Sequence, residues 1–141
     1  MSRVGIVTGG TCGIGEAISI MLKDNGYTVA AKYTGNDKAA AAFSKANGIN
    51  VYRFDVGDFD ACETSIAQIT ADLGPIEVLV NNAGITRDGN MHRMERDKWD
   101  AVINTNLGSC FNMSRLVIES MRSKGFDQIV NIGSINGIAG Q

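Results

Sequence analysis

Three glycines with the spacing G-x-x-x-G-x-G follow the first apolar run of the chain, within the stretch TGGTCGIG at residues 8–15. Gly9 can make a tight turn, Gly13 lets backbone come close to a pyrophosphate, and Gly15 lets a following helix pack closely. The N-terminus of that helix offers unpaired N–H groups and a partial positive charge to phosphate. A glycine-rich turn can be purely structural. Because this one lies between a predicted strand and a predicted helix, we expect it to bind a dinucleotide.

Polar residues also follow the later predicted strands or interrupt a predicted helix, in the stretches FDV at 54–56, NNAG at 81–84, NTNL at 104–107 and NIGS at 131–134. Ligands of open α/β sheets bind outside the carboxyl ends of the strands, so Ser134, after the fifth predicted strand, should point into that crevice. Each of these stretches has a structural alternative. Asp55 can cap the next helix, although Asp58 suits that position better. Asn106 can be bonded to backbone, and a serine such as Ser134 is common at a strand end.

The end of the second predicted strand bears on the choice of cofactor. NAD-binding folds usually place Asp or Glu there, on the ribose 2′-hydroxyl. This chain has Lys32, Tyr33 and Thr34 at that point and no acid. Lys32 can attract a 2′-phosphate and Thr34 can hydrogen-bond it, which favours NADP(H) over NAD(H). Asp37 is the competing acid, and we expect it to cap or start the following helix.

The apolar pattern alternates between the periods of strands and helices. It predicts strands over 3–8, 27–33, 50–54, 76–81 and 128–132, and helices over 14–25, 37–47, 58–73 and 97–122. The last helix is expected to break near Asn104, because Asn is a poor residue for a helix interior. Regular alternation predicts an α/β fold with a Rossmann-like, doubly wound parallel sheet. We expect one domain over 1–141, truncated after about its fifth strand.

The bulk properties exclude several classes of protein. With 141 residues and 44% hydrophobic residues the chain can form one core. A net charge of −2 gives no basic footprint for nucleic acid. No run of eighteen apolar residues exists, so we expect no membrane span. The three cysteines, Cys12, Cys62 and Cys110, form no metal-binding pattern with the single His92, which predicts reduced thiols, no metal site and a cytoplasmic protein.

The combination of TGxxxGxG with NNAG resembles the short-chain dehydrogenase/reductase family, and the resemblance covers all 141 residues. It implies that Asp55 and the backbone N–H of Val56 hold the adenine ring. It also implies that Asn106 positions a water in a proton relay and that Ser134 hydrogen-bonds the carbonyl of the substrate. Gln141 is a further, weak candidate for a substrate contact.

The cofactor site that follows from these motifs comprises Thr8, Gly9, Gly10, Thr11, Cys12, Gly13, Ile14, Gly15, Lys32, Tyr33, Thr34, Asp55, Val56, Asn82, Ala83 and Gly84. One position departs from the family. Members that use NADPH often have Arg where this chain has Cys12, so a contact with the 2′-phosphate would be weaker here. A thiol at a helix N-terminus can also have a lowered pKa and oxidise easily, although a simple substitution is the plainer interpretation.

Within the family, the stretches GITRD at 84–88, 104–111 and 129–141 most resemble the members that reduce acetoacetyl-CoA to the (R)-3-hydroxybutyryl thioester with NADPH, in polyhydroxybutyrate synthesis. Reductases of 3-oxoacyl-carrier-protein substrates share most of these features. The resemblance also implies a catalytic Tyr with Lys four residues later. Tyr27, Tyr33 and Tyr52 lack that lysine. We therefore expect a fragment of a reductase, inactive by itself.

Two alternatives stay open at this point. The chain can be a non-catalytic dinucleotide-binding module, although the presence of Asn106 and Ser134 favours an enzyme. The resemblance further implies a homo-oligomer, a tetramer for the full-length form, with residues 107–118 of the long helix facing a partner. From sequence, that helix can equally bury one face within its own subunit, and Trp99, Met113 and Met121 are expected in the core or at an interface.

Overall fold

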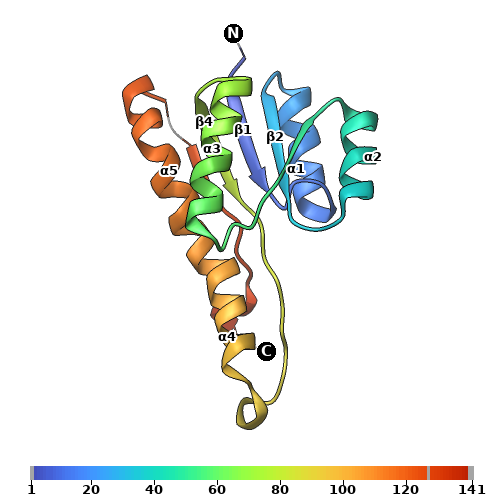
Figure 1. The fold of residues 1–141 in the computed structure, drawn as a ribbon, viewed down its shortest axis with the longest axis vertical. Coiled ribbons are helices and arrows are strands. Elements are labelled where there is room, and N and C mark those ends of the chain that lie inside the picture. The colour runs from blue at the N-terminus through green and yellow to red at the C-terminus, as the bar shows by residue number, and fades with distance from the viewer. Residues whose placement is uncertain (1, 127, 140–141) are drawn as a thin grey trace.

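The computed structural model describes residues 2–126 and 128–139 (Figure 1). Five strands alternate with helices along the chain, as the sequence predicts. The strands are β1 (Val4–Thr8), β2 (Thr28–Tyr33), β3 (Asn50–Arg53), β4 (Ile76–Asn81) and β5 (Gln128–Asn131). The helices are α1 (Gly13–Asp24), α2 (Asp37–Asn47), α3 (Phe59–Leu73), η1 (Met91–Arg93), α4 (Arg96–Ile103), η2 (Asn104–Gly108), α5 (Ser109–Lys124) and α6 (Asn136–Ala139).

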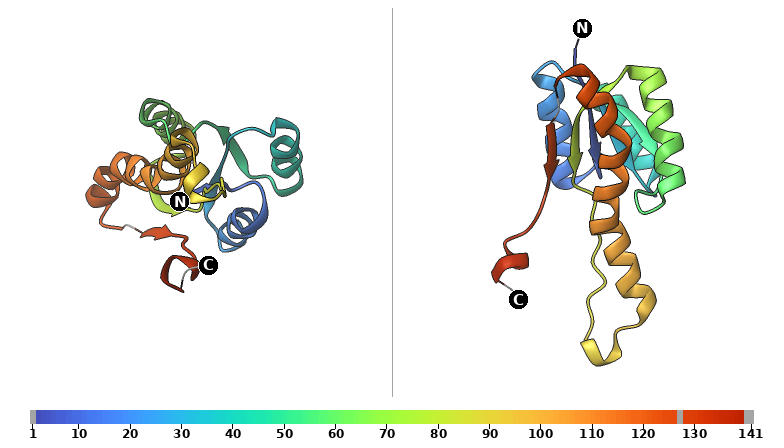
Figure 2. Two further views of the ribbon diagram at one scale, coloured as in Figure 1. Left: turned by 90° about the horizontal axis from the view of Figure 1, so that it is seen from below. Right: turned by 90° about the vertical axis from the view of Figure 1, so that its left-hand side faces the viewer.

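The five strands form one parallel sheet in the order β3-β2-β1-β4-β5. The order reverses direction at β1, because the chain first builds outward through β2 and β3 and then returns to place β4 on the other side. Right-handed crossovers consequently put α1 and α2 on one face and α3 and α5 on the other (Figure 2). The predicted doubly wound, Rossmann-like sheet is confirmed, and the carboxyl ends of β1 and β4 are neighbours.

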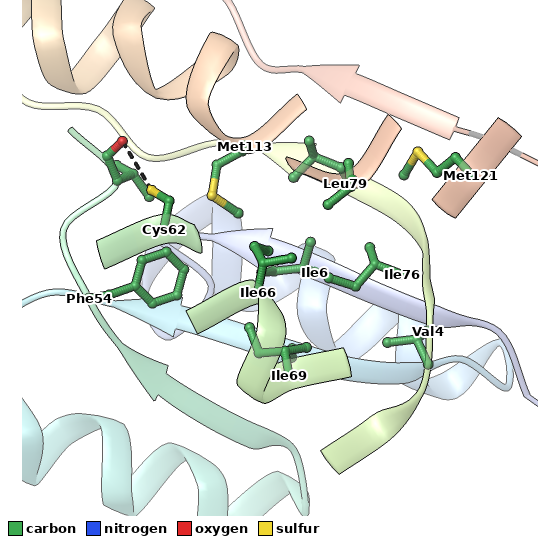
Figure 3. Packing of buried hydrophobic residues seen from close by; sticks show 13 residues of the cluster. Val4, Ile6, Phe54, Cys62, Ile66, Ile69, Ile76, Leu79, Met113 and Met121 are labelled. Carbon is green, nitrogen blue, oxygen red and sulfur yellow. Dashed lines mark hydrogen bonds between the residues drawn. The ribbon is translucent and has the colours of Figure 1, made fainter. Parts of the chain in front are cut away.

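Two apolar clusters hold the layers together, one on each face of the sheet. The first lies between the sheet and helices α3 and α5, and includes Ile6, Leu79, Ile66 and Met113 (Figure 3). The second packs strand residues against α1 and α2 and is completed by Phe43 of α2. Successive side chains of a strand point alternately into the two clusters. This explains why all five residues of β1 are buried.

The helix expected over 97–122 is one helical run from Arg96 to Lys124, with a π-helical turn at Asn104–Gly108. The predicted irregularity near Asn104 is therefore a wider turn rather than a break. Beyond this turn α5 buries one face, including Met113 and Met121. Before it, α4 has no buried residue and extends past the end of the sheet together with the preceding loop, forming an arm (Figure 1).

Large apolar residues on the arm, in the π-helical turn and on the outer side of α5 are exposed. Trp99 is 52% exposed, Leu107 66% and Phe111 65%. Trp99 is thus outside the core of this chain, whereas Met113 and Met121 are inside it. None of the helices within 2–126 and 128–139 is long and apolar enough to cross a membrane.

Lys32 is buried in the core, with 2% of its surface exposed. Its ammonium group donates to the Thr34 hydroxyl at 2.6 Å and lies 5.6 Å from the centre of the Phe54 ring. Burial lowers the pKa of Lys32 to about 8, and the nearby Asp55 carboxylate only partly opposes this effect. The sequence suggested a lysine that attracts a 2′-phosphate from solvent. The structure instead places its charge inside the protein, because Lys32 shares the face of β2 that packs toward Phe54.

This burial predicts a pH-dependent penalty on stability. The unfolded chain keeps the Lys32 proton up to about pH 10.5, whereas the folded chain releases it near pH 8. Between these values the unfolded state binds more protons, so the free energy of unfolding rises with pH. We expect Lys32→Met to stabilise the protein by about 1–3 kcal/mol at pH 7, and this advantage to shrink as the pH rises from 8 to 10.5.

The measurement is denaturant unfolding at several pH values, on protein made from the complete coding sequence. Lys98→Met, at an exposed lysine of α4, is the matched control and should show no such pH-dependent difference. An advantage of Lys32→Met that is constant between pH 7 and pH 10.5 would contradict the assignment.

Candidate functional site

The glycine loop between β1 and α1 has the geometry of a phosphate-binding turn. Gly9 and Gly13 adopt left-handed backbone conformations, with φ of 65° and 55°, which favour glycine. A side chain at Gly13 would meet no protein atom within 4 Å, so the space beside this residue is open to a ligand. A Cβ at Gly15 would instead collide with the Gly9 carbonyl and lie 2.6 Å from the Asn82 amide nitrogen. Gly15 is therefore needed for packing, and Gly13 for the left-handed turn.

The N-terminus of α1 is left open to an anion. Cys12 occupies the N-cap position with an extended backbone, and its side chain makes no capping hydrogen bond. The first bond of the helix runs from the Glu16 N–H to the Cys12 carbonyl, at 3.2 Å. The N–H groups of Gly13, Ile14 and Gly15 precede that bond and have no intrahelical acceptor. These groups and the helix dipole therefore favour a phosphate at this point.

Thr8 connects the glycine loop to the NNAG segment. Its side-chain oxygen accepts the backbone N–H groups of Asn82 and Ala83, both at 2.9 Å, and donates to the Val80 carbonyl at 3.4 Å. The Asn82 amide donates in return to the Thr8 carbonyl, at 3.0 Å. Thr8 is 1% exposed, so its hydroxyl acts within the protein and holds the NNAG segment through these bonds. Asn82, Ala83 and Gly84 are consequently held directly beside the glycine loop.

The glycine loop is also tied to β2 and to its own helix. The Gly10 N–H donates to the Lys32 carbonyl at 2.9 Å, and the Ser19 hydroxyl donates to the Gly10 carbonyl at 2.9 Å. Thr11, the residue after Gly10, is partly exposed at the tip of the turn. Sequence reasoning missed Ser19. The one available signal was a polar residue on the apolar face of the predicted helix, four positions beyond Gly15.

The predicted adenine side lies in the loop after β3. The Asp55 carboxylate accepts the Gly57 N–H at 2.8 Å, and Asp58 caps α3 by accepting the Ala61 N–H at 3.1 Å, as expected. Val56 is buried, and its carbonyl accepts from the Asn112 amide of α5 at 2.9 Å. Asn112, which sequence reasoning also missed, therefore positions the backbone that would contact the adenine.

Asn106 lies in the π-helical turn and holds the segment after NNAG at two points. Its side-chain oxygen accepts the Ile85 N–H at 2.8 Å, and its amide donates to the Ile85 carbonyl at 2.9 Å. A π-turn often marks a functional site, because it widens the helix and changes the direction of its carbonyl groups. The sequence-based alternative, an Asn bonded to backbone, is thus correct for the contacts of Asn106 and is compatible with a catalytic role.

Ser134 follows β5 on the same edge of the sheet. It is exposed, and its hydroxyl accepts the Asn136 N–H at 3.2 Å, at the beginning of α6. Within the described part of the chain, no hydrogen bond joins Ser134 to Asn106. Gln141, the candidate for a substrate contact, lies outside the described residues. Asn81 of β4 donates to the Asn131 side chain of β5 at 2.9 Å, which aligns the two strand ends below Ser134.

Tyr33 and Tyr52 each donate their hydroxyl to a carboxylate. The Tyr52 hydroxyl donates to Asp72 at 3.0 Å, and burial with this bond raises the pKa of Tyr52 to about 12. Tyr33 donates to Asp37 at 2.9 Å, which raises its pKa as well. Such phenols are poor proton donors at neutral pH. In residues 2–126 and 128–139, no cluster of three or more Cys, His, Asp or Glu side chains could hold a metal ion.

Comparison with known proteins assigns these features to one family. The sequence model described as short chain dehydrogenase matches residues 3–141. The chain belongs to the short-chain dehydrogenase family. This match includes every motif at the carboxyl edge of the sheet, from the glycine loop to Ser134.

The individual relatives are similar throughout this chain. It is 59% identical over all 141 residues to acetoacetyl-CoA reductase of Shinella zoogloeoides and 55% identical over 141 residues to the enzyme of that name from Rhizobium meliloti. It is 39% identical, over 98% of its length, to a 3-oxoacyl-acyl-carrier-protein reductase of Vibrio harveyi. The chain spans only 57–58% of the length of these curated relatives.

The packing around Gly15 predicts that a single added methyl group strongly destabilises the protein. Gly15→Ala should destabilise the protein by about 2–4 kcal/mol, because the new Cβ collides with the Gly9 backbone and displaces the glycine loop. Gly35→Ala is the control, since a Cβ there meets nothing within 4 Å and no positive φ is required. Unfolding of the two variants should be compared under one condition. Equal stability of both would show that the loop accommodates a larger residue at position 15.

The Thr8 contacts predict that the stability of the protein depends on the Thr8 hydroxyl. Thr8→Val keeps the shape of the side chain but leaves the N–H groups of Asn82 and Ala83 without their acceptor. We expect a loss of about 2 kcal/mol in the free energy of unfolding. Thr8→Ser retains the hydroxyl and should recover most of that loss. If Thr8→Val is no more destabilising than Thr8→Ser, which keeps the hydroxyl and loses only the methyl group, the hydrogen bonds to Asn82 and Ala83 are not the main contribution of this residue.

Proposed function

We propose that the protein reduces a 3-ketoacyl thioester with NADPH, acetoacetyl-CoA being converted to (R)-3-hydroxybutyryl-CoA for polyhydroxybutyrate synthesis. The single observation on which this depends is the 55–59% identity, over 97–100% of the chain, to proteins named acetoacetyl-CoA reductase. Family membership supports an oxidoreductase of this class. The proposal extends to the whole protein, of which this chain supplies the carboxyl edge of the sheet with its cofactor-binding motifs.

The residues at this edge fit a nicotinamide dinucleotide. The open N-terminus of α1 and the free space beside Gly13 suit a pyrophosphate. The second carboxylate oxygen of Asp55 and the Val56 N–H would be available for the adenine, since the Gly57 N–H donates to Asp55 Oδ1 and Asn112 donates to the Val56 carbonyl. Asn82, Ala83 and Gly84 would line the pocket between these groups. When bound, the reduced cofactor supplies the hydride.

The residues of this chain would then bind and orient the substrate. The Ser134 hydroxyl would donate a hydrogen bond to the 3-keto oxygen, where negative charge develops during reduction. Asn106 would hold a water of the proton relay at the π-helical turn, while its side chain keeps the Ile85 backbone in place. The proton itself requires an acidic phenol, which Tyr33 and Tyr52 are not. We propose that a Tyr-x-x-x-Lys pair in the remainder of the protein supplies it, so that residues 1–141 alone are inactive.

Two other functions remain as alternatives with weaker support. The first is reduction of 3-oxoacyl-acyl-carrier-protein in fatty-acid synthesis, the activity in the name of relatives that are 37–39% identical. The second is a non-catalytic dinucleotide-binding module. The presence of both Ser134 and Asn106 favours an enzyme, because binding a dinucleotide requires neither.

We further propose a cytoplasmic homo-oligomer, tetrameric in the full-length form. The outer side of the α4–α5 helical run supports a partner there, since Leu107 and Phe111 are each about two-thirds exposed on it. Its inner side is already used within the subunit by Met113 and Met121.

The proposal is tested by following NADPH absorbance in protein made from the complete coding sequence. We expect a higher kcat/KM for acetoacetyl-CoA than for the acyl-carrier-protein thioester, and no turnover by residues 1–141 alone. A preference for the carrier protein would favour the first alternative. NADPH binding without reduction of either thioester would favour the second.

The role of Ser134 is tested in the same assay. Ser134→Ala should lower kcat by about 10²–10³-fold with little change in the KM for NADPH, because it removes a hydrogen bond that strengthens in the transition state. Ser123→Ala is the matched control, since this exposed hydroxyl at the far end of α5 bonds only the Ser120 carbonyl. A kcat of Ser134→Ala within a few-fold of the control would remove Ser134 from the mechanism.

A further inference from the structure

Arg53 is an exposed cation at the carboxyl edge of the sheet. None of the sequence motifs includes it. It is the last residue of β3 and is paired in register with Tyr33, the last residue of β2. Its Nε donates to the Thr34 carbonyl at 3.0 Å, and its Nη1 donates to the Asp37 carboxylate at 3.1 Å. Tyr33 donates to the other oxygen of Asp37, at 2.9 Å. We call Tyr33, Thr34, Asp37 and Arg53 the edge cluster.

The edge cluster is connected to the phosphate loop through a short series of contacts. The Gly10 N–H donates to the Lys32 carbonyl, and the Lys32 ammonium donates to the Thr34 hydroxyl. Arg53 then binds the carbonyl of that same Thr34. The guanidinium therefore lies beside the loop that follows β2, where the ribose of a dinucleotide on the glycine loop would be expected.

In the edge cluster, the Asp37 carboxylate occupies the position on the Arg53 guanidinium that a 2′-phosphate would take. Asp37, the acid that could accept a ribose 2′-hydroxyl, already accepts from Arg53 and Tyr33. The side chains of Arg53 and Asp37 are 58% and 60% exposed, and such a surface ion pair contributes little to stability. A guanidinium binds phosphate in a planar, two-point geometry. A 2′-phosphate could thus displace Asp37 from Nη1 while the Nε bond to Thr34 keeps Arg53 in position.

Lys32 does not fill this role, since its ammonium is buried and already bonded within the protein. We propose that Arg53 is the residue that selects NADP(H), by exchanging the Asp37 carboxylate for the 2′-phosphate, and that Asp37 acts against this selection. This inference rests on the proposed NADPH-dependent function and adds to it the residue pair that sets the preference.

The test is fluorescence titration of NADPH and NADH into protein made from the complete coding sequence. Arg53→Ala should weaken NADPH binding about tenfold or more, because a hydrogen-bonded charge on the 2′-phosphate is lost, and change NADH binding less than about twofold. Asp37→Asn removes the competing negative charge. It should tighten NADPH binding up to about fivefold with little effect on NADH. The two variants are thus expected to move the NADPH/NADH affinity ratio in opposite directions.

A purely structural role for the edge cluster predicts a different outcome. Both substitutions break the same Arg53–Asp37 contact, so they would then change the affinities for both cofactors in the same direction. Tyr33→Phe removes a hydrogen bond of Asp37 without changing charge and should leave the ratio within about twofold. Arg96→Ala, which breaks the exposed ion pair with Asp100 on the arm, is the control for loss of a surface arginine and should change neither affinity.

The outcomes distinguish a failure of the NADPH-dependent function from a failure of the role of Arg53. A wild-type protein that binds no dinucleotide, or that prefers NADH, overturns the NADPH-dependent function itself. A wild-type protein that prefers NADPH, together with parallel or absent changes of the ratio in Arg53→Ala and Asp37→Asn, overturns only the role of Arg53. Opposite changes of the ratio in these two variants confirm it.

Discussion

The hydrogen bonds of a single hydroxyl hold the two halves of the site together. Thr8 and the Asn82–Ala83 backbone are more than seventy residues apart in sequence, yet they meet where β1 and β4 end side by side. Asn82 and Ala83 directly follow β4 and are half-buried, and the nearly fully buried Thr8 supplies the acceptor for both of their N–H groups. The glycine loop, the open end of α1 and the NNAG segment take their positions from this connection.

Two cations near the carboxyl end of β2 lie on opposite faces of the sheet, and one is buried while the other is exposed. Lys32 faces the apolar layer below α3, where burial lowers its pKa, and its bond to Thr34 orients the loop. Arg53 approaches the same loop from β3 and remains open to solvent. The alternation of side chains along a strand accounts for the difference, since adjacent positions point to opposite faces.

The helical run from α4 to α5 serves the sheet and the site at once. Past the π-turn, α5 packs its apolar side on the sheet and donates through Asn112 to the loop after β3. At the turn, Asn106 holds the backbone at Ile85. Before the turn, α4 leaves the sheet and makes no core of its own.

The sequence by itself determined the order of the elements, the doubly wound sheet and the positions of the motifs, because hydrophobic periodicity and glycine spacing are local properties. The predicted bounds of the strands agree with the structure to within one residue or so, and Asp58 was recognised as a cap. Only the tertiary structure decided which way Lys32 points and that Arg53 lies against Asp37. Burial and pairing of charges depend on neighbouring strands and loops, and no local pattern encodes them.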